Sequence, residues 1–183
     1  MRRWQEKQPQ FGHTMKVLLA VLVLFVALLS RLTVRLDGNL GEKTVVIALP
    51  ANQCYQRITD LSTYPRWMVS VKSTEASQNA GIPKVGHRFV ITMDWGFLGT
   101  MSYDAFVIKA DGHQTYVFDV DNWLGLRVDA YIIPTGHNKC KLRLKITSRV
   151  KNILQKWFIH PFARLYYTNW LTHSLLAFQL TYS

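Results

Sequence analysis

Apolar and polar residues alternate over much of the chain after residue 88, which is the period of half-buried β-strands. The alternation runs through residues 89–95, 101–107, 116–120, 124–132 and 139–149. Turn-forming residues such as those of Asp111-Gly112 separate these runs. The pattern therefore predicts a series of antiparallel strands that bury one face against a core.

The segment before these strands changes its period. Residues 44–49 form a β-branched run that ends at Pro50, a residue suited to the first turn of a helix. Apolar residues then recur at helical spacing over residues 51–61. The aromatic residues and the proline of residues 64–67 indicate a second short helix or a corner.

The helical period returns after Arg149 and continues to Tyr182. Only Pro161 interrupts this segment, and we expect the helix to kink or break there. The order of elements is therefore one strand, two short helices, a run of antiparallel strands and a long C-terminal helix. This order predicts an α+β fold.

Every residue from Val17 to Leu29 is apolar, and basic residues flank this run on both sides. A helix over 15–34 reaches the ~20 residues that span a bilayer if Lys16 and Arg31 extend their charges to the two interfaces. We therefore expect one uncleaved transmembrane helix and a single-pass membrane localisation, with the side of the domain left open. A secretory signal sequence and a buried core helix are the alternatives.

These features divide the chain into three parts. Residues 1–36 form a basic tail and a transmembrane anchor, residues 37–43 a turn-rich linker, and residues 44–183 one folded domain. A chain of 183 residues that is 49% hydrophobic is long and apolar enough for one such domain.

The net charge of +11 indicates an anionic neighbour, either nucleic acid or an acidic lipid surface. Basic residues form a stripe on the polar face of the last strand and beyond it: Lys139, Lys141, Arg143, Lys145, Arg149, Lys151 and Lys156. This stripe could contact anionic lipid headgroups near a membrane, or it could be an ordinary solvated face. Nucleic acid is not an expected partner, because the tryptophans fit a core or a membrane interface better.

Four short motifs carry a resemblance to a known superfamily. They are Pro50 at the start of the first helix, Thr59-Asp60-Leu61 at its end, Tyr64-Pro65-Arg66-Trp67, and the turn Gly81-Ile82-Pro83-Lys84-Val85-Gly86. With these motifs, residues 44–183 resemble the START-like superfamily, also called SRPBCC, and particularly its polyketide cyclase/dehydrase branch. The resemblance implies a helix-grip fold, in which a curved antiparallel sheet surrounds the long C-terminal helix.

The resemblance also implies an apolar cavity between the sheet and that helix, which would hold a lipid-like or polyketide-like molecule. The predicted ligand-binding set consists mainly of residues whose alternate positions along the strands place them on the inner face, with two more from the C-terminal helix. It contains Trp67, Phe89, Ile91, Met93, Trp95, Met101, Tyr103, Ala105, Tyr116, Phe118, Phe162 and Tyr166. Aromatic and methionine side chains suit an apolar ligand. The same residues could equally be an ordinary core.

No catalytic constellation is visible, so we expect membrane-tethered binding of a hydrophobic small molecule and not an enzyme. The alternative is a polyketide cyclase/dehydrase-type enzyme in which Tyr103, Tyr116 or His173 moves protons in the same pocket. His160 and His173 would lie roughly 20 Å apart on one helix, too far to share a metal. We expect no metal and no cofactor, and we read Cys54 and Cys140 as buried apolar residues.

Four aspartates on the predicted strands have the parity opposite to the apolar residues. They are Asp94, Asp104, Asp119 and Asp129. Their parity predicts outward positions on solvated faces, so none is assigned as a catalytic base.

Overall fold

The computed structural model describes residues 15–24, 37–76 and 83–182, which fall into two units, Met1–Val34 and Arg35–Ser183. Within the first unit, residues 15–24 form a helix, and the rest of the predicted anchor lies outside the described residues. Within the described ranges no helix is long and apolar enough to cross a membrane. The predicted single-pass membrane localisation is therefore wrong, and the predicted transmembrane helix and membrane partner are unsupported.

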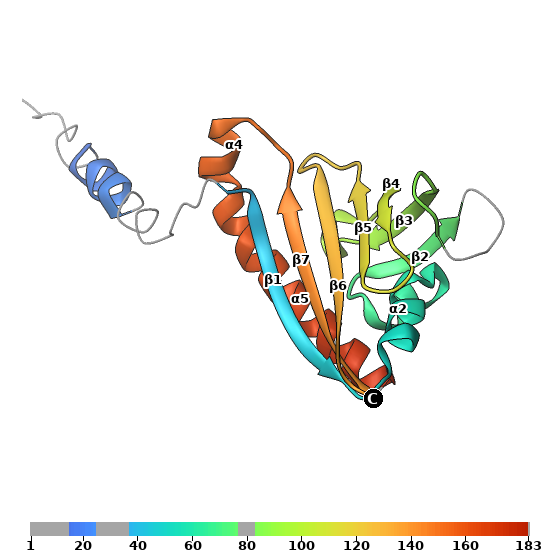
Figure 1. Cartoon of the computed structure of the whole chain (residues 1–183). Coiled ribbons are helices and arrows are strands. Elements are labelled where there is room, and N and C mark those ends of the chain that lie inside the picture. The colour runs from blue at the N-terminus through green and yellow to red at the C-terminus, as the bar shows by residue number, and fades with distance from the viewer. Residues whose placement is uncertain (1–14, 25–36, 77–82, 183) are drawn as a thin grey trace, which may run out of the picture. The chain divides into compact units, whose positions relative to one another are not determined.

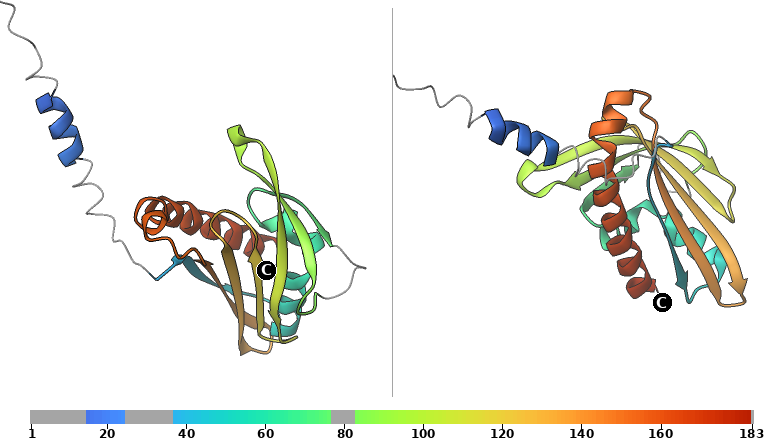
Figure 2. Two further views of the ribbon diagram at one scale, coloured as in Figure 1. Left: turned by 90° about the horizontal axis from the view of Figure 1, so that it is seen from above. Right: turned by 90° about the vertical axis from the view of Figure 1, so that its left-hand side faces the viewer.

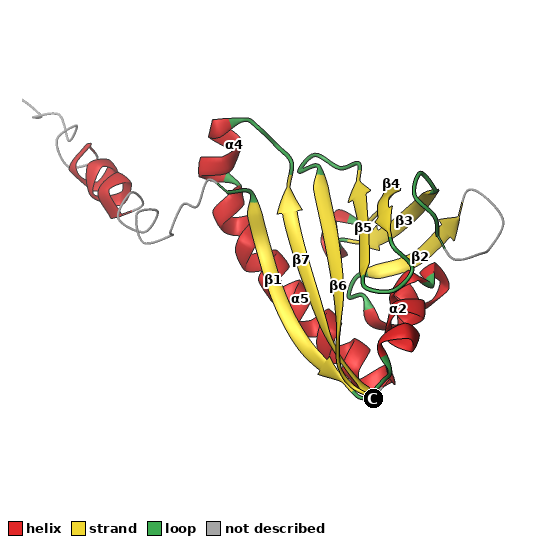
Figure 3. Cartoon of the chain, viewed as in Figure 1, coloured by secondary structure: helices red, strands yellow, loops and turns green. Residues whose placement is uncertain are grey.

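The second unit is built on one antiparallel sheet with the strand order β1-β7-β6-β5-β4-β3-β2 (Figure 1). The strands are β1 (Asn39–Ile47), β2 (Val71–Ala76), β3 (Arg88–Asp94), β4 (Thr100–Ala110), β5 (Thr115–Val120), β6 (Leu126–Gly136) and β7 (Lys139–Ser148). The helices are α2 (Ala51–Thr59), α3 (Tyr64–Trp67), α4 (Ile153–Phe158) and α5 (His160–Tyr182). Helices and sheet form separate layers (Figure 3), so the predicted α+β class is confirmed.

The predicted alternation sets which face of the sheet is buried. In β7, Cys140, Leu142, Leu144 and Ile146 are at most 2% exposed, while the intervening residues lie on the other face. The strand pairing continues this inner face across the sheet, for example from Leu144 to its β6 partner Ala130. A single core therefore lies between the inner face of the sheet and the helices.

Helix α5 is held at both edges of the sheet. At the β1 edge, Arg164 Nε donates to the carbonyl of Asn39 at 2.8 Å, and Gln179 Nε2 donates to that of Val46 at 3.3 Å. At the other edge, before β2, Trp170 Nε1 donates to the carbonyl of Val69 at 2.7 Å. Figure 2 shows α5 along one side of the curved sheet, which is the arrangement expected of a helix-grip fold.

The structure differs from the sequence prediction at two strands and agrees with it at the helix break. Strand β1 begins at Asn39, inside the predicted linker, and β2 was not predicted at all. The C-terminal helix is divided at Ile159, directly before His160 and Pro161, so the predicted break is confirmed.

Gly38 marks the entry into β1 and cannot accept a side chain. Its φ is +71°, and a Cβ atom there would lie 2.7 Å from the carbonyl oxygen of Ser148. Because that oxygen belongs to the backbone, it cannot turn away. We expect Gly38→Ala to lower the free energy of unfolding by about 2–3 kcal/mol, measured by urea denaturation.

Gly112→Ala is the matched control for this prediction. Gly112 has a similar φ of +82°, but a Cβ atom at this position would meet no other atom within 4 Å. Strain alone is expected to lower the stability of this variant by about 1 kcal/mol. Equal losses in the two variants would show that contact with Ser148 plays no part.

Candidate functional site

Most of the predicted ligand-binding residues fall into two groups, and the first is tightly packed. Four of them belong to an aromatic core cluster, which consists of Tyr64, Trp67, Phe89, Tyr116, Phe118 and Phe178, all at most 2% exposed. Ring centroids lie 5.0 Å apart for Trp67 and Phe178, 5.5 Å for Phe89 and Phe118, and 5.6 Å for Tyr116 and Phe118. In the structure these side chains fill the interior by contacting one another.

Two of the three side-chain polar atoms of this cluster have hydrogen-bond partners. Tyr64 Oη donates to the carbonyl of Ile58 at 3.0 Å, and Trp67 Nε1 donates to Thr63 Oγ1 at 3.3 Å. The Tyr116 hydroxyl is buried and makes no hydrogen bond of normal geometry to the described residues. Burial raises the pKa of both tyrosine hydroxyls, so they stay protonated at neutral pH.

The second group lies where the β3–β4 hairpin passes α5 (Figure 2). We call it the hairpin–helix cluster; it consists of Met93, Trp95, Met101, Tyr103, Tyr166 and Tyr167. Pairing of β3 with β4 sets Met93 opposite Met101 and Ile91 opposite Tyr103, so all four share the inner face. The Trp95 ring stacks on the Tyr166 ring of α5 at 5.4 Å and 25°.

Solvent reaches this cluster, in contrast to the rest of the inner face. Met101 is 42% exposed and Tyr166 is 38% exposed, whereas Ile91 and Ala105, also in the predicted set, are 4% and 0% exposed. The predicted residues therefore form a gradient from a sealed core to a partly open end. An apolar molecule could contact the open end without displacing the core.

Several hydrogen-bonding groups converge at this open end. Trp95 Nε1 is buried and has no hydrogen-bond partner within the described part of the chain. Tyr103 Oη contacts Met101 Sδ at 3.2 Å. Burial raises the pKa of Tyr166 and Tyr167, a hydrogen bond with the Ser70 side chain lowers that of Tyr166 in part, and the nearby Tyr103 hydroxyl adds to both upward shifts. At neutral pH these tyrosines keep their protons, so the cluster combines one buried N–H with phenolic O–H groups among apolar side chains.

One predicted residue lies elsewhere. Phe162 is 56% exposed and follows the side of α5 that faces away from the core, so it does not line the interior. Three residues of the two clusters were in turn not predicted from the sequence, namely Tyr64, Tyr167 and Phe178. Tyr64 stands in the same short motif as Trp67, and Tyr167 directly follows Tyr166, so the sequence carries a signal for both residues.

The two histidines of the C-terminal helix have opposite surroundings. His173 is exposed, whereas His160 is 1% exposed and neither of its ring nitrogens has a hydrogen-bond partner among the described residues. No group of three His, Cys, Asp or Glu side chains in the described ranges is arranged to hold a metal ion.

The burial of His160 predicts a pH dependence of stability. Burial, and then the charges of Arg164 and Lys156, lower the pKa of His160 below its usual value near 6.5, while Asp37 acts in the opposite direction. Just below that pH the unfolded chain binds more protons than the folded protein. The free energy of unfolding should therefore fall as pH decreases from 7.5 to 5.5, as measured by urea denaturation.

His160→Phe should flatten this pH profile, because the variant keeps an aromatic ring but cannot take up a proton. His173→Phe is the control and should keep the wild-type slope, since His173 is exposed. If His160→Phe kept the wild-type pH dependence of the free energy of unfolding, His160 would not be its cause.

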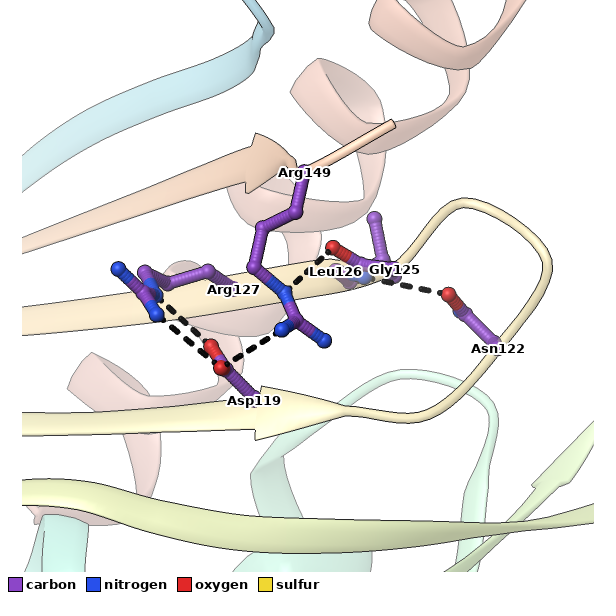
Figure 4. Close-up of polar contacts among 6 residues, drawn as sticks. All are labelled: Asp119, Asn122, Gly125, Leu126, Arg127 and Arg149. Atoms are coloured by element: carbon purple, nitrogen blue, oxygen red, sulfur yellow. Dashed lines mark hydrogen bonds and ion pairs between the residues drawn. The ribbon is translucent and has the colours of Figure 1, made fainter. Parts of the chain in front are cut away.

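Asp119 is buried, although its parity predicted a solvated position. Its side chain is 6% exposed, and Arg127 contacts both carboxylate oxygens, at 2.8 and 3.1 Å. Arg149 Nη1 contacts the same carboxylate at 3.1 Å, and its Nε donates to the carbonyl of Gly125 (Figure 4). The carboxylate lies on the outer face of the sheet, away from the hairpin–helix cluster, and its contacts assign it a structural role.

Both cysteines are buried, as predicted. Cys54 and Cys140 are 0% exposed and are not joined by a disulfide. Burial raises the pKa of the Cys54 thiol, so it remains a thiol at neutral pH.

Comparison with known proteins shows the fold. The sequence matches no protein-family model and no curated protein. Similar solved structures include a protein from Deinococcus radiodurans, with a TM-score of 0.55 and 19% identity over 76% of this chain and 93% of that chain. A START superfamily protein from Mycobacterium smegmatis aligns with a TM-score of 0.50 and 16% identity over 74% of this chain and 97% of that one.

A third similar structure is the di-domain ARO/CYC protein BexL of the BE-7585A biosynthetic pathway. It has a TM-score of 0.61 and 14% identity over 76% of this chain and 44% of BexL, so the chain spans less than half of that protein. At these identities the likeness concerns the fold alone. Together with the strand order, it confirms the predicted helix-grip fold.

Proposed function

We propose that this START-like domain binds an apolar small molecule at the hairpin–helix cluster. One observation carries the proposal: aromatic and methionine side chains of the inner face are left partly exposed at one end, with Met101 at 42% and Tyr166 at 38%. Rings and thioethers offer contact area to an apolar guest at little polar cost. Ligand sites typically combine such walls with a few hydrogen-bonding groups.

The donors of the cluster favour a guest with an acceptor oxygen. Trp95 Nε1 lacks a partner among the described residues, and Tyr166 and Tyr167 keep their protons at neutral pH. A lipid-like or polyketide-like molecule with a carbonyl or hydroxyl group at one end fits this combination. The similar structures include proteins described as START superfamily and as ARO/CYC, which supports a guest of this kind.

A cyclase/dehydrase-type activity has less support. Of the three residues considered for proton transfer, His173 is exposed on α5 and Tyr116 belongs to the sealed aromatic core cluster. The third, Tyr103, directs its hydroxyl to Met101 Sδ at 3.2 Å. Burial raises the pKa of the Tyr116 hydroxyl, which makes it a poor base at neutral pH. Binding without chemistry is therefore the function we propose.

The proposal is tested with N-phenyl-1-naphthylamine, an uncharged dye that fluoresces in apolar sites, added to the full chain. We expect saturable uptake that Tyr166→Ala and Met101→Trp weaken at least about tenfold, since one removes a wall and the other obstructs it. Trp157→Ala, which removes a 54% exposed ring from α4, is the control and should bind like the wild type. Equal uptake by all four proteins would contradict the proposal.

Trp95→Phe should separate binding from folding. The substitution removes a buried N–H that has no partner among the described residues but keeps a ring that can stack on Tyr166. Stability, measured by urea denaturation, should change by less than about 1 kcal/mol, because no hydrogen bond is lost. Affinity for a ketone-bearing analogue of the dye should fall by roughly five- to thirtyfold, while affinity for the ketone-free dye should stay the same. Equal losses for both probes would contradict the donor role.

A further inference from the structure

The side of α5 that faces away from the core carries almost no charge. Arg164 is the one Asp, Glu, Lys or Arg residue of α5, and its guanidinium is turned toward Asn39 and Asp37. We call the outward residues the outer stripe: Phe162, Leu165, Asn169, Thr172, Leu176 and Leu180, all exposed. The four apolar members are between 51% and 78% exposed.

The outer stripe has the spacing of a helix–helix seam. Its members follow one another at intervals of three or four residues, the repeat of positions that meet in paired helices. They lie opposite the buried stripe that contains Tyr167, Leu171 and Phe178. From end to end the outer stripe extends roughly 27 Å. In Figure 2 the C-terminal half of α5 has the sheet on one side only.

We propose that the outer stripe is a homodimer interface, in which α5 helices of two copies pack antiparallel. The stripe is complementary to itself in that arrangement. Phe162 would face Leu180 of the partner copy, and Leu165 would face Leu176. At the centre the amide of Asn169 would meet the hydroxyl of Thr172, so the two neutral polar residues pair with each other. Antiparallel packing also sets opposite ends of the helix dipoles side by side.

The lack of charge on the stripe fits a second copy better than a charged partner. The chain has a net charge of +11, and an uncharged surface such as this stripe lets two copies meet without like charges in direct contact. An acidic partner would have no lysine or arginine of the outer stripe to pair with. The stripe also lacks the tryptophans and lysines that typify helices lying on a lipid surface. A central Asn–Thr pair is instead a feature that sets the register of paired helices.

The mass of the full chain in solution tests the proposal. Light scattering after size exclusion should give twice the monomer mass of 21.2 kDa for the wild type. Leu176→Glu would bury an unpaired carboxylate against Leu165 of the partner copy and should raise the dissociation constant at least about thirtyfold. Val85→Glu, which changes a residue that is 61% exposed outside α5, should remain dimeric. A monomeric wild type, or a Leu176→Glu variant that stays dimeric while folded by circular dichroism, would overturn the proposal.

Disulfide trapping tests the antiparallel arrangement. The double variant Leu165→Cys/Leu176→Cys should form covalent dimers under mild oxidation, because position 165 of one copy faces position 176 of the partner copy. Leu176→Cys alone should not cross-link. The native Cys54 and Cys140 are buried and should not interfere. Efficient cross-linking of the single variant would show parallel helices and overturn the proposed arrangement. Dye uptake should be the same in monomeric Leu176→Glu, so this proposal and the ligand-binding proposal can fail separately.

Discussion

Trp67→Ala is expected to lower the free energy of unfolding by about 3–5 kcal/mol, the usual loss for a buried tryptophan. The Trp67 ring is 2% exposed and makes edge contacts with Tyr64 at 5.4 Å and Phe178 at 5.0 Å. It therefore joins α3 to α5, and its removal leaves a void that neither rigid helix can close. Urea denaturation should show a lower midpoint with an unchanged slope.

Trp157→Ala is the control, because the same atoms are removed from a ring that is 54% exposed. Its stability should stay within about 0.5 kcal/mol of the wild type. A loss below about 1 kcal/mol for Trp67→Ala would mean that the side chains around Trp67 rearrange to fill the space that the ring leaves. The ligand would then have room among the aromatic core cluster, and the proposed division between sealed core and open end would be wrong.

The strands could be predicted where one face is apolar. Strand β7 was predicted over residues 139–149 and is observed over Lys139–Ser148, because its alternation has no break. Strand β2 was missed, because its sequence VKSTEA has only Val71 and Ala76 as apolar residues. As an edge strand it pairs on one side, with β3, and needs little apolar surface.

The start of β1 was missed for a different reason. The sequence around Gly41 suggests a turn, yet here glycine lets α5 approach closely. A Cβ at position 41 would lie 3.1 Å from Leu171 Cδ1 and 3.3 Å from the backbone nitrogen of Thr168. Such a contact between segments far apart in the chain leaves no local signal.

The site could be predicted only as a face of the sheet. The alternation along the strands places Phe89 and Met101 on the same face of the sheet. It does not predict that Phe89 is 1% exposed and Met101 42%. That difference depends on where α5 crosses the sheet, which its bonds to Asn39 and Val69 set. Phe162 was misplaced because the rotation of α5 about its axis depends on the break before His160.

Asp119 shows that an outward position need not be a solvated one, and Asp119→Asn should measure the difference. The substitution keeps the size of the side chain but removes the charge that Arg127 and Arg149 share. Two arginines would then face each other without a carboxylate between them. The two arginine side chains are 38% and 45% exposed, so water compensates in part. We expect a loss of about 2–3 kcal/mol in the free energy of unfolding.

Asp104→Asn is the matched control for this loss, because Asp104 is an exposed aspartate on the neighbouring strand β4 and should contribute less than about 0.5 kcal/mol. If the carboxylate acts by joining three strand ends, Arg127→Gln and Asp119→Asn should not be additive. Arg127 comes from β6, Asp119 from β5, and Arg149 follows β7. Additive losses in the double variant would mean that Asp119 and Arg127 do not stabilise each other. A loss in Asp119→Asn no larger than that in Asp104→Asn would show that the charge of Asp119 contributes little to stability.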